Sequence, residues 1–193
     1  MKKIYMLCLL FTLIGFTSLV AQKRNTGFIV KVTGDTLRGY FDFSQLGAAM
    51  SMNLRVTFID EQSNTSIKYA PFQIKGWQLD KEGIFNESKV LQRKGEEEGY
   101  AVFMQRLIAK GDVIAYRYSE QSGQMPITEY YLERHQKMHY LPFNKKFYTV
   151  LAEYLKDNET LSTAIANKSY KGNKEKALIE ILTIYNEWFD ANW

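Results

Sequence analysis

Cysteine and histidine are scarce in this chain, and their scarcity excludes several kinds of active site. The 193 residues include one cysteine, Cys8, and two histidines, His135 and His139. Because Cys8 lies in the apolar N-terminal stretch, residues 22–193 can form no disulfide, cysteine-based metal site or cysteine nucleophile. Serine catalysis would have only the two histidines as its usual base, and the sequence contains no Gly-x-Ser-x-Gly motif.

Charge of one sign and chain-breaking residues are also in short supply. Of the 25 Lys and Arg residues, Lys2 and Lys3 lie at the extreme N-terminus, which leaves 23 against 21 Asp and Glu. A nucleic-acid-binding protein needs a strongly basic surface, so we expect no nucleic-acid partner. With three prolines and 12 glycines, no linker or disordered tail is predicted. No glycine-rich phosphate loop or other cofactor motif is present, so no cofactor is predicted.

The N-terminus has the pattern of a secretion signal, with cleavage expected after Ala21. Lys2 and Lys3 precede a nearly continuous apolar run over residues 4–20, and Ala21 is a small residue suited to the cleavage position. The alternative is an uncut membrane anchor, although the run is at the lower limit of length for a spanning helix. We therefore expect an exported protein of the periplasm or cell surface, with no stable membrane span after cleavage.

The first two thirds of the remaining chain have the alternation of β-strands. Residues 28–32 and 37–43 are β-rich runs on either side of Gly34 and Asp35, which predicts a hairpin with a two-residue turn. In the second run Leu37 and Phe41 share one face, as a sheet with one buried face requires. Similar runs recur as far as residue 141, and a second hairpin is predicted to turn at Lys110 and Gly111.

The last third changes to helical spacing. Leu178, Ile181, Leu182 and Tyr185 form an apolar stripe, and Asn158 and Asn173 are predicted N-caps. Strands followed by helices indicate an α+β fold. We predict a single domain over residues 22–193. About seven to nine antiparallel strands would form a sheet or roll over residues 26–141, followed by two or three helices over residues 144–190.

Several short blocks resemble a family of uncharacterised secreted proteins of the Bacteroidetes, which share a signal peptide and a "GDTLxGY"-type hairpin. The blocks are Gly27–Ile29 with Gly34–Tyr40; Tyr69–Pro71 with Ile74–Trp77; Phe103, Leu107, Gly111, Tyr116 and Tyr118; and Tyr170, Leu178, Leu182, Tyr185 and Asn186. Many relatives have a cysteine near the position of Asn158, which this chain lacks. The resemblance implies an envelope location and a β-then-α order, and it implies no activity.

The residues that could carry chemistry each have a competing structural explanation. His135 and His139 are four apart, as in helical zinc sites, but they follow a tyrosine-rich strand, so they are weak metal candidates and no metal site is predicted. Paired carboxylates could cleave glycosidic bonds. The aspartates weighed for such a pair mostly lie at predicted turns, where they commonly bond the backbone: Asp35, Asp42, Asp60, Asp80 and Asp112. No catalytic residue is predicted.

Three functions fit this sequence. The first is a non-enzymatic binding or structural module that meets an envelope protein or a glycan, with Trp77, Trp188 and Trp193 as candidate contact residues. The competing explanation for these tryptophans is core packing. The second is an envelope hydrolase acting on glycans or peptides. The third is a small outer-membrane β-barrel, for which eight alternating strands would suffice.

Overall fold

The computed structural model describes residues 25–44, 52–93, 96–122, 125–170 and 172–193. The signal peptide and its cleavage site after Ala21 lie outside these residues. The described elements are β1 (Asn25–Lys31), β2 (Thr36–Phe41), β3 (Val56–Asp60), β4 (Ser66–Tyr69), η2 (Pro71–Gln73), β5 (Ile74–Leu79), β6 (Phe85–Leu91), β7 (Tyr100–Arg106), β8 (Ile114–Ser122), β9 (Met125–Arg134), β10 (Lys137–Leu141), α2 (Phe147–Tyr154), α3 (Glu159–Ala166) and α4 (Lys174–Asn192).

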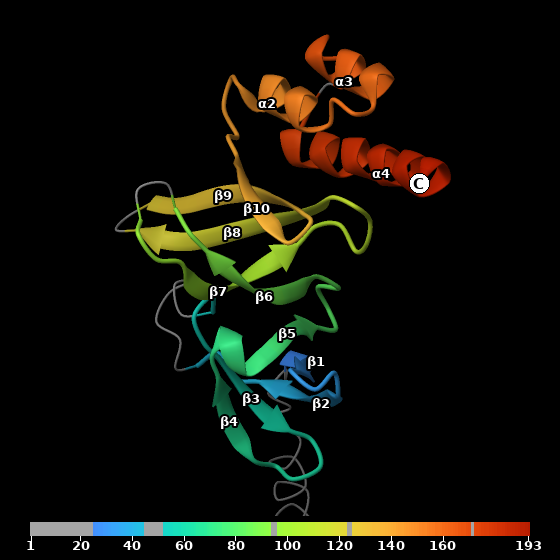
Figure 1. The fold of residues 1–193 in the computed structure, drawn as a ribbon. Helices are drawn as coiled ribbons and strands as arrows, with labels where there is room; N and C mark the ends of the chain where they lie inside the picture. Colours follow the sequence, from blue (N-terminus) through green and yellow to red (C-terminus); the bar gives the residue numbers. More distant parts are fainter. Residues whose placement is uncertain (1–24, 45–51, 94–95, 123–124, 171) are drawn as a thin grey trace, which may run out of the picture.

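The described strands form one antiparallel sheet, and the three helices follow it, so the α+β prediction is confirmed. The strand order is β10-β9-β8-β7-β6-β5-β1-β2-β3-β4. In Figure 1 the helices lie together beside β9 and β10, and β1 to β4 lie at the opposite end of the molecule. Because β10 and β4 are the two edges of this order, the sheet of the described residues is open rather than the closed cylinder that our third function required.

The sheet has ten strands rather than the predicted seven to nine, because residues 137–141 form a strand of their own. Arg134 pairs with Lys137 across a two-residue turn made by His135 and Gln136. Both turn residues have positive φ, 51° and 63°. Tight hairpin turns of this kind usually carry Asn-Gly or Asp-Gly, so His-Gln gave no recognisable turn pattern in the sequence.

The first hairpin is present, but its turn is longer than predicted. Lys31 N–H donates to the Asp35 carbonyl at 2.8 Å, so Val32, Thr33 and Gly34 form a three-residue loop. Gly34 has a φ of 102°, a conformation that costs a glycine little. The predicted alternation holds, since Phe41 is buried while Arg38 is exposed.

An aromatic core holds the N-terminal half of the sheet together. Trp77 of β5 lies with its ring 5.2 Å from Phe41 and 6.3 Å from Phe103. Phe58 meets Phe41 edge-on at 5.3 Å. These rings are almost fully buried and pack with Ile29, which lies directly opposite Trp77 in the β1–β5 pairing.

The helices cover one face of the C-terminal strands. Both predicted N-caps are confirmed, because the Asn158 side chain accepts from Leu161 N–H, and Asn173 accepts from Glu175 N–H and Lys176 N–H. The apolar stripe of α4 is fully buried and packs with strand residues such as Ala115, Leu132 and Leu141. No helix among the described residues has the length and apolar character needed to cross a membrane.

Asn186 fastens α4 to the β7–β8 turn. Its side-chain oxygen accepts from Val113 N–H, and its side-chain nitrogen donates to the Val113 carbonyl, both at 2.9 Å. A Cβ built at Gly111, in the predicted turn, would lie only 2.2 Å from the Asn186 side chain. Because Gly111 has no side chain, the Asn186 amide can approach the turn closely and bond both backbone polar groups of Val113.

Candidate functional site

The strands under the helices also present a second face, which carries a dense group of ionisable side chains. Ala115 and Leu132 point toward the helices, so their neighbours Tyr116 and Tyr131, which are paired with each other, point to the opposite side. We call this opposite surface the polar face. It comprises Glu87, Lys89, Arg93, Arg106, Tyr116, Tyr118, Glu120, Glu129, Tyr131 and Glu133.

Tyrosine rings and a few aliphatic side chains form the floor of the polar face. Tyr116, Tyr118 and Tyr131 are 1–3% exposed and pack with Val102 and Met104. Their hydroxyl groups reach the charged side chains above them, so each ring is buried while its oxygen keeps a polar partner. This arrangement lets one sheet face exclude water without a covering helix.

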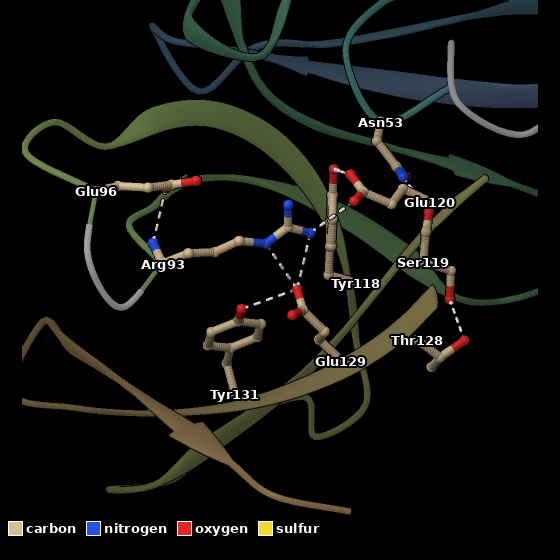
Figure 2. Close-up of polar contacts among 9 residues, drawn as sticks. All are labelled: Asn53, Arg93, Glu96, Tyr118, Ser119, Glu120, Thr128, Glu129 and Tyr131. Carbon is tan, nitrogen blue, oxygen red and sulfur yellow. Dashed lines mark hydrogen bonds and ion pairs between the residues drawn. The ribbon is translucent and has the colours of Figure 1, made fainter. Parts of the chain in front are cut away.

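Arg93 is the centre of the outer cluster of the polar face (Figure 2). Its guanidinium group bonds Glu120 Oε1 at 2.9 Å and Glu129 Oε2 at 3.0–3.1 Å. The Tyr118 hydroxyl donates to Glu120 at 2.8 Å, and the Tyr131 hydroxyl donates to Glu129 at 3.1 Å. One cation thus holds carboxylates from two neighbouring strands, and each carboxylate also accepts from a buried tyrosine.

These contacts hold the outer cluster in its charged form. Burial alone would raise the pKa of Glu120, but the hydrogen bonds from Tyr118 and Arg93 outweigh it and lower the pKa. Burial lowers the pKa of Arg93, and its bonds with Glu120 and Glu129 reverse that and raise the pKa. Burial, followed by the nearby carboxylates, raises the pKa of Tyr118 and Tyr131, so both remain neutral donors.

The inner cluster repeats the same design around Lys89. Lys89 Nζ lies 3.1 Å from Glu87 Oε1 and 2.7 Å from Glu133 Oε2. The Tyr116 hydroxyl is 2.9 Å from both Glu87 Oε2 and Glu133 Oε2, and Arg106 reaches Glu87 at 3.4 Å. Burial and the two carboxylates raise the pKa of Tyr116. The four carboxylates of the polar face therefore meet three cations at short range.

The contact between Lys89 and Glu133 shows that the sheet curls toward the polar face. Lys89 is on β6 and Glu133 is on β9, so two strands lie between them. In a flat sheet three strand spacings would separate their backbones by about 14 Å. Their charged atoms meet at 2.7 Å, because curvature and long side chains together close that gap.

A seam runs through the sheet beside the outer cluster. β7 and β8 pair only at Gln105–Arg117 and Arg106–Tyr116, although both strands continue beyond these residues. Asn53 spans the seam, because its carbonyl accepts from Phe103 N–H at 2.7 Å and its side-chain amide donates to the Ser119 carbonyl. Figure 2 shows Asn53 beside Ser119, next to Glu120. A loop residue thus replaces strand pairing at this point.

A separate pocket of about 400 Å³ opens near the start of α4. It is lined by the β5–β6 hairpin, the end of β7 with the turn that follows it, Arg117 of β8, and Glu175 and Ile179 of α4. Arg117 Nη1 lies 3.0 Å and 2.9 Å from the two Glu175 carboxylate oxygens, and Arg117 Nε donates to Gln105 at 2.7 Å. The Tyr130 hydroxyl donates to Glu175 at 2.6 Å. Burial and Glu175 raise the pKa of Tyr130 to about 12.

The two histidines do not lie together on a helix. His135 is in the β9–β10 turn, largely exposed, with Nε2 3.5 Å from Asp112 Oδ1. His139 is on β10, and its ring meets Tyr154 edge-on at 5.1 Å. Within the described ranges, no group of three or more His, Cys, Asp or Glu side chains is placed to hold a metal ion.

The three candidate tryptophans have different environments. Trp77 is 2% exposed in the aromatic core, as the competing explanation of core packing expects. Trp188 is partly buried against the helical core, with its ring 5.7 Å from Tyr185. Trp193 is 87% exposed at the end of α4 and stacks on Phe189 at 6.0 Å. Trp193 is the candidate that presents most of its surface to solvent.

The five candidate aspartates are dispersed along the chain, and each bonds either a nearby backbone or hydroxyl group or a distant arginine. Asp42 and Asp60 accept from nearby backbone N–H and serine groups, which lower the pKa of each. Asp35 accepts from Thr33. Asp80 pairs with Arg38, and Asp112 pairs with Arg134 at 2.6 Å.

On the polar face the carboxylates that come together are glutamates. Elsewhere Asp112 and Asp157 both pair with Arg134. Glu129, Tyr131 and Glu133 are spaced two apart, as are Tyr116, Tyr118 and Glu120, and as are Glu87 and Lys89. In strands this spacing places the side chains on one face, so polar alternation was the available pattern. The spacing gives the shared face, but it does not give which carboxylates meet across neighbouring strands.

Comparisons of the chain with protein-family models, with curated proteins and with solved structures gave no match. The resemblance to secreted Bacteroidetes proteins therefore stays a prediction from short sequence blocks.

Proposed function

We propose that the protein is an exported, non-enzymatic binding or structural module of the cell envelope. The observation that carries this proposal is the pairing of charges on the polar face. Each of its four glutamates bonds a cation and a tyrosine hydroxyl. A general acid works best when its pKa is raised toward the working pH. The pKa of Glu120 is instead lowered by Tyr118 and Arg93, as suits a carboxylate with a structural role.

The export half of the proposal depends on the apolar run over residues 4–20 and on Ala21. An exported chain without a disulfide must be held by non-covalent packing alone. Three buried clusters support this view, and one of them is assembled from tyrosines under ion pairs. The partner we propose is an envelope protein or a glycan.

Fractionation of cells that express the C-terminally tagged chain tests this proposal. Membranes would be washed with alkaline carbonate, and the intact mass of the chain would be read in each fraction. We expect a form that begins at Gln22 in the soluble envelope fraction. An uncut form that resists the wash would contradict the proposal, because it would mean a retained anchor.

A hydrolase of envelope glycans or peptides is the second candidate, and one observation favours it. Glu87 and Glu133 lie close enough to share the Tyr116 hydroxyl at 2.9 Å each, so a carboxylate pair does exist. Retaining glycosidases hold two carboxyl groups about 5–5.5 Å apart. The purified chain would be incubated with isolated envelope glycans beside a Glu133→Gln variant. Product release by the wild type alone would favour this candidate over the binding module.

A further inference from the structure

The pocket beside α4 is built from parts of the chain that are far apart in sequence. Gly83 and Phe85 on one side of the pocket are separated in sequence from Glu175 and Ile179 on the other by β7 to β10 and two helices. Its volume of about 400 Å³ falls in the range that holds small organic ligands. Ligand sites favour such junctions, because side chains from several elements can converge on one molecule.

Two opposite charges lie side by side in the lining of this pocket. Arg117 and Glu175 are joined through Arg117 Nη1, and their side chains are 26% and 25% exposed. Gln105 and Tyr130 hold them from the sheet side. These hydrogen bonds hold the Arg117 and Glu175 side chains in place before a ligand binds. The loss of side-chain conformational entropy on binding is therefore smaller.

The remaining lining is mainly apolar. Phe85, Leu107 and Ile179 supply aromatic and aliphatic surface from three different elements. Arg106 also lines the pocket, but its guanidinium group already bonds the carbonyls of Ile108 and Ala109 and reaches Glu87. Glu87 offsets the charge of Arg106. The lining therefore presents Arg117 and Glu175 as one fixed cation–anion pair, together with apolar walls.

We infer that this pocket binds a zwitterionic small molecule with apolar side chains, namely an amino acid or short peptide. A ligand of one charge gains little, since attraction to Arg117 is offset by repulsion from Glu175, or the reverse. A zwitterion places its carboxylate toward Arg117 and its ammonium group toward Glu175, and its side chains contact Leu107 and Ile179. This inference rests on the proposed binding function and adds a small-molecule ligand to it.

Calorimetric titration of the mature chain, residues 22–193, with the dipeptide Leu-Leu tests the inference. Acetyl-Leu-Leu lacks the ammonium group, and Leu-Leu-amide lacks the carboxylate, so each removes one charge. We expect both analogues to bind at least tenfold more weakly than the dipeptide. Absence of dipeptide binding would overturn the inference, and so would equal affinity for either analogue.

Variants locate the binding in the pocket. Arg117→Gln and Glu175→Gln should each weaken dipeptide binding at least tenfold. Ala109→Trp should block the pocket from its exposed rim without altering either charge, which keeps the test valid if a charge variant misfolds. Lys156→Gln removes an exposed Lys–Glu pair elsewhere and should leave binding unchanged. Unchanged binding in Ala109→Trp would overturn the assignment. A soluble, processed chain that does not bind the dipeptide would remove the ligand and leave the export proposal standing.

Discussion

The two faces of the C-terminal strands solve the same burial problem in different ways. On one face Ala115, Leu132 and Leu141 are covered by helices and pack in a cluster of apolar side chains. On the other, Tyr116 and Tyr131 are buried to a similar degree beneath ion pairs rather than beneath another element. The comparison shows that a sheet face can exclude water with its own long side chains when the sheet curls enough for them to meet.

The largest expected effect is on the helix-covered face. Leu182→Ala should lower the free energy of unfolding by about 3 kcal/mol, because a fully buried side chain leaves a cavity. Urea denaturation measures the change. Ile184→Ala, on the same helix but 40% exposed, is the matched control and should change stability by no more than about 0.5 kcal/mol. Similar losses in both variants would mean that α4 does not bury the predicted stripe.

The polar face should respond to the loss of a cation. Lys89→Met should lower the free energy of unfolding by about 2 kcal/mol, because Glu133 would lose its cation and Glu87 would keep only Arg106, at 3.4 Å. Lys156→Met, in an ion pair that is about 70% exposed, should have almost no effect, since solvent screens such pairs. A stable Lys89→Met protein would show that the ion pairs of the polar face are dispensable.

Two tyrosines allow the faces to be compared with the same substitution. The Tyr116 hydroxyl bonds carboxylates on the polar face, and the Tyr185 hydroxyl bonds Asp157 at 2.6 Å on the helix side. Tyr116→Phe and Tyr185→Phe should each cost about 1.5 kcal/mol, because each removes a hydrogen bond to a charged group. Thermal or urea unfolding of the pair checks this. A much smaller loss for Tyr116→Phe would mean that the polar face is open to water.

The smallest effect is a change in pH dependence. Because the pKa of Glu120 is lowered in the folded state, its contribution to stability is present above the unfolded pKa of about 4.3 and is lost as the pH falls through the folded value. Stability measured between pH 6 and pH 3 should therefore fall less steeply for Glu120→Gln than for the wild type. If the curves of stability against pH were parallel for the two proteins, Glu120 would not be charged and hydrogen-bonded in the folded state.

Local patterns in the sequence predicted much of the fold. The strand alternation, the caps Asn158 and Asn173, and the stripe of α4 were recognisable because each depends on neighbours within a few residues. The β9–β10 hairpin could not be recognised in the sequence. The positive φ of His135 and Gln136 is imposed by strand pairing and not by residue type.

The candidate site could be predicted only in its parts. Tyrosines and glutamates two apart on β8 and β9 indicate a polar strand face. Which glutamate meets which cation depends on strand order, and Lys89 reaches Glu133 only because β6 and β9 curl toward each other. The pocket likewise requires α4 to return over β8, which brings Glu175 to Arg117.

By itself, then, the sequence determined the period of most elements, the order of strands before helices and the absence of thiol chemistry in residues 22–193. Tertiary structure alone decided that Trp77 is a core residue, that Asn53 closes a seam and that four glutamates share three cations. The physical reason is the separation of the interacting residues along the sequence. Strand and helix periods depend mostly on neighbouring side chains, whereas ion pairs and pockets form between distant residues that only the strand order brings together.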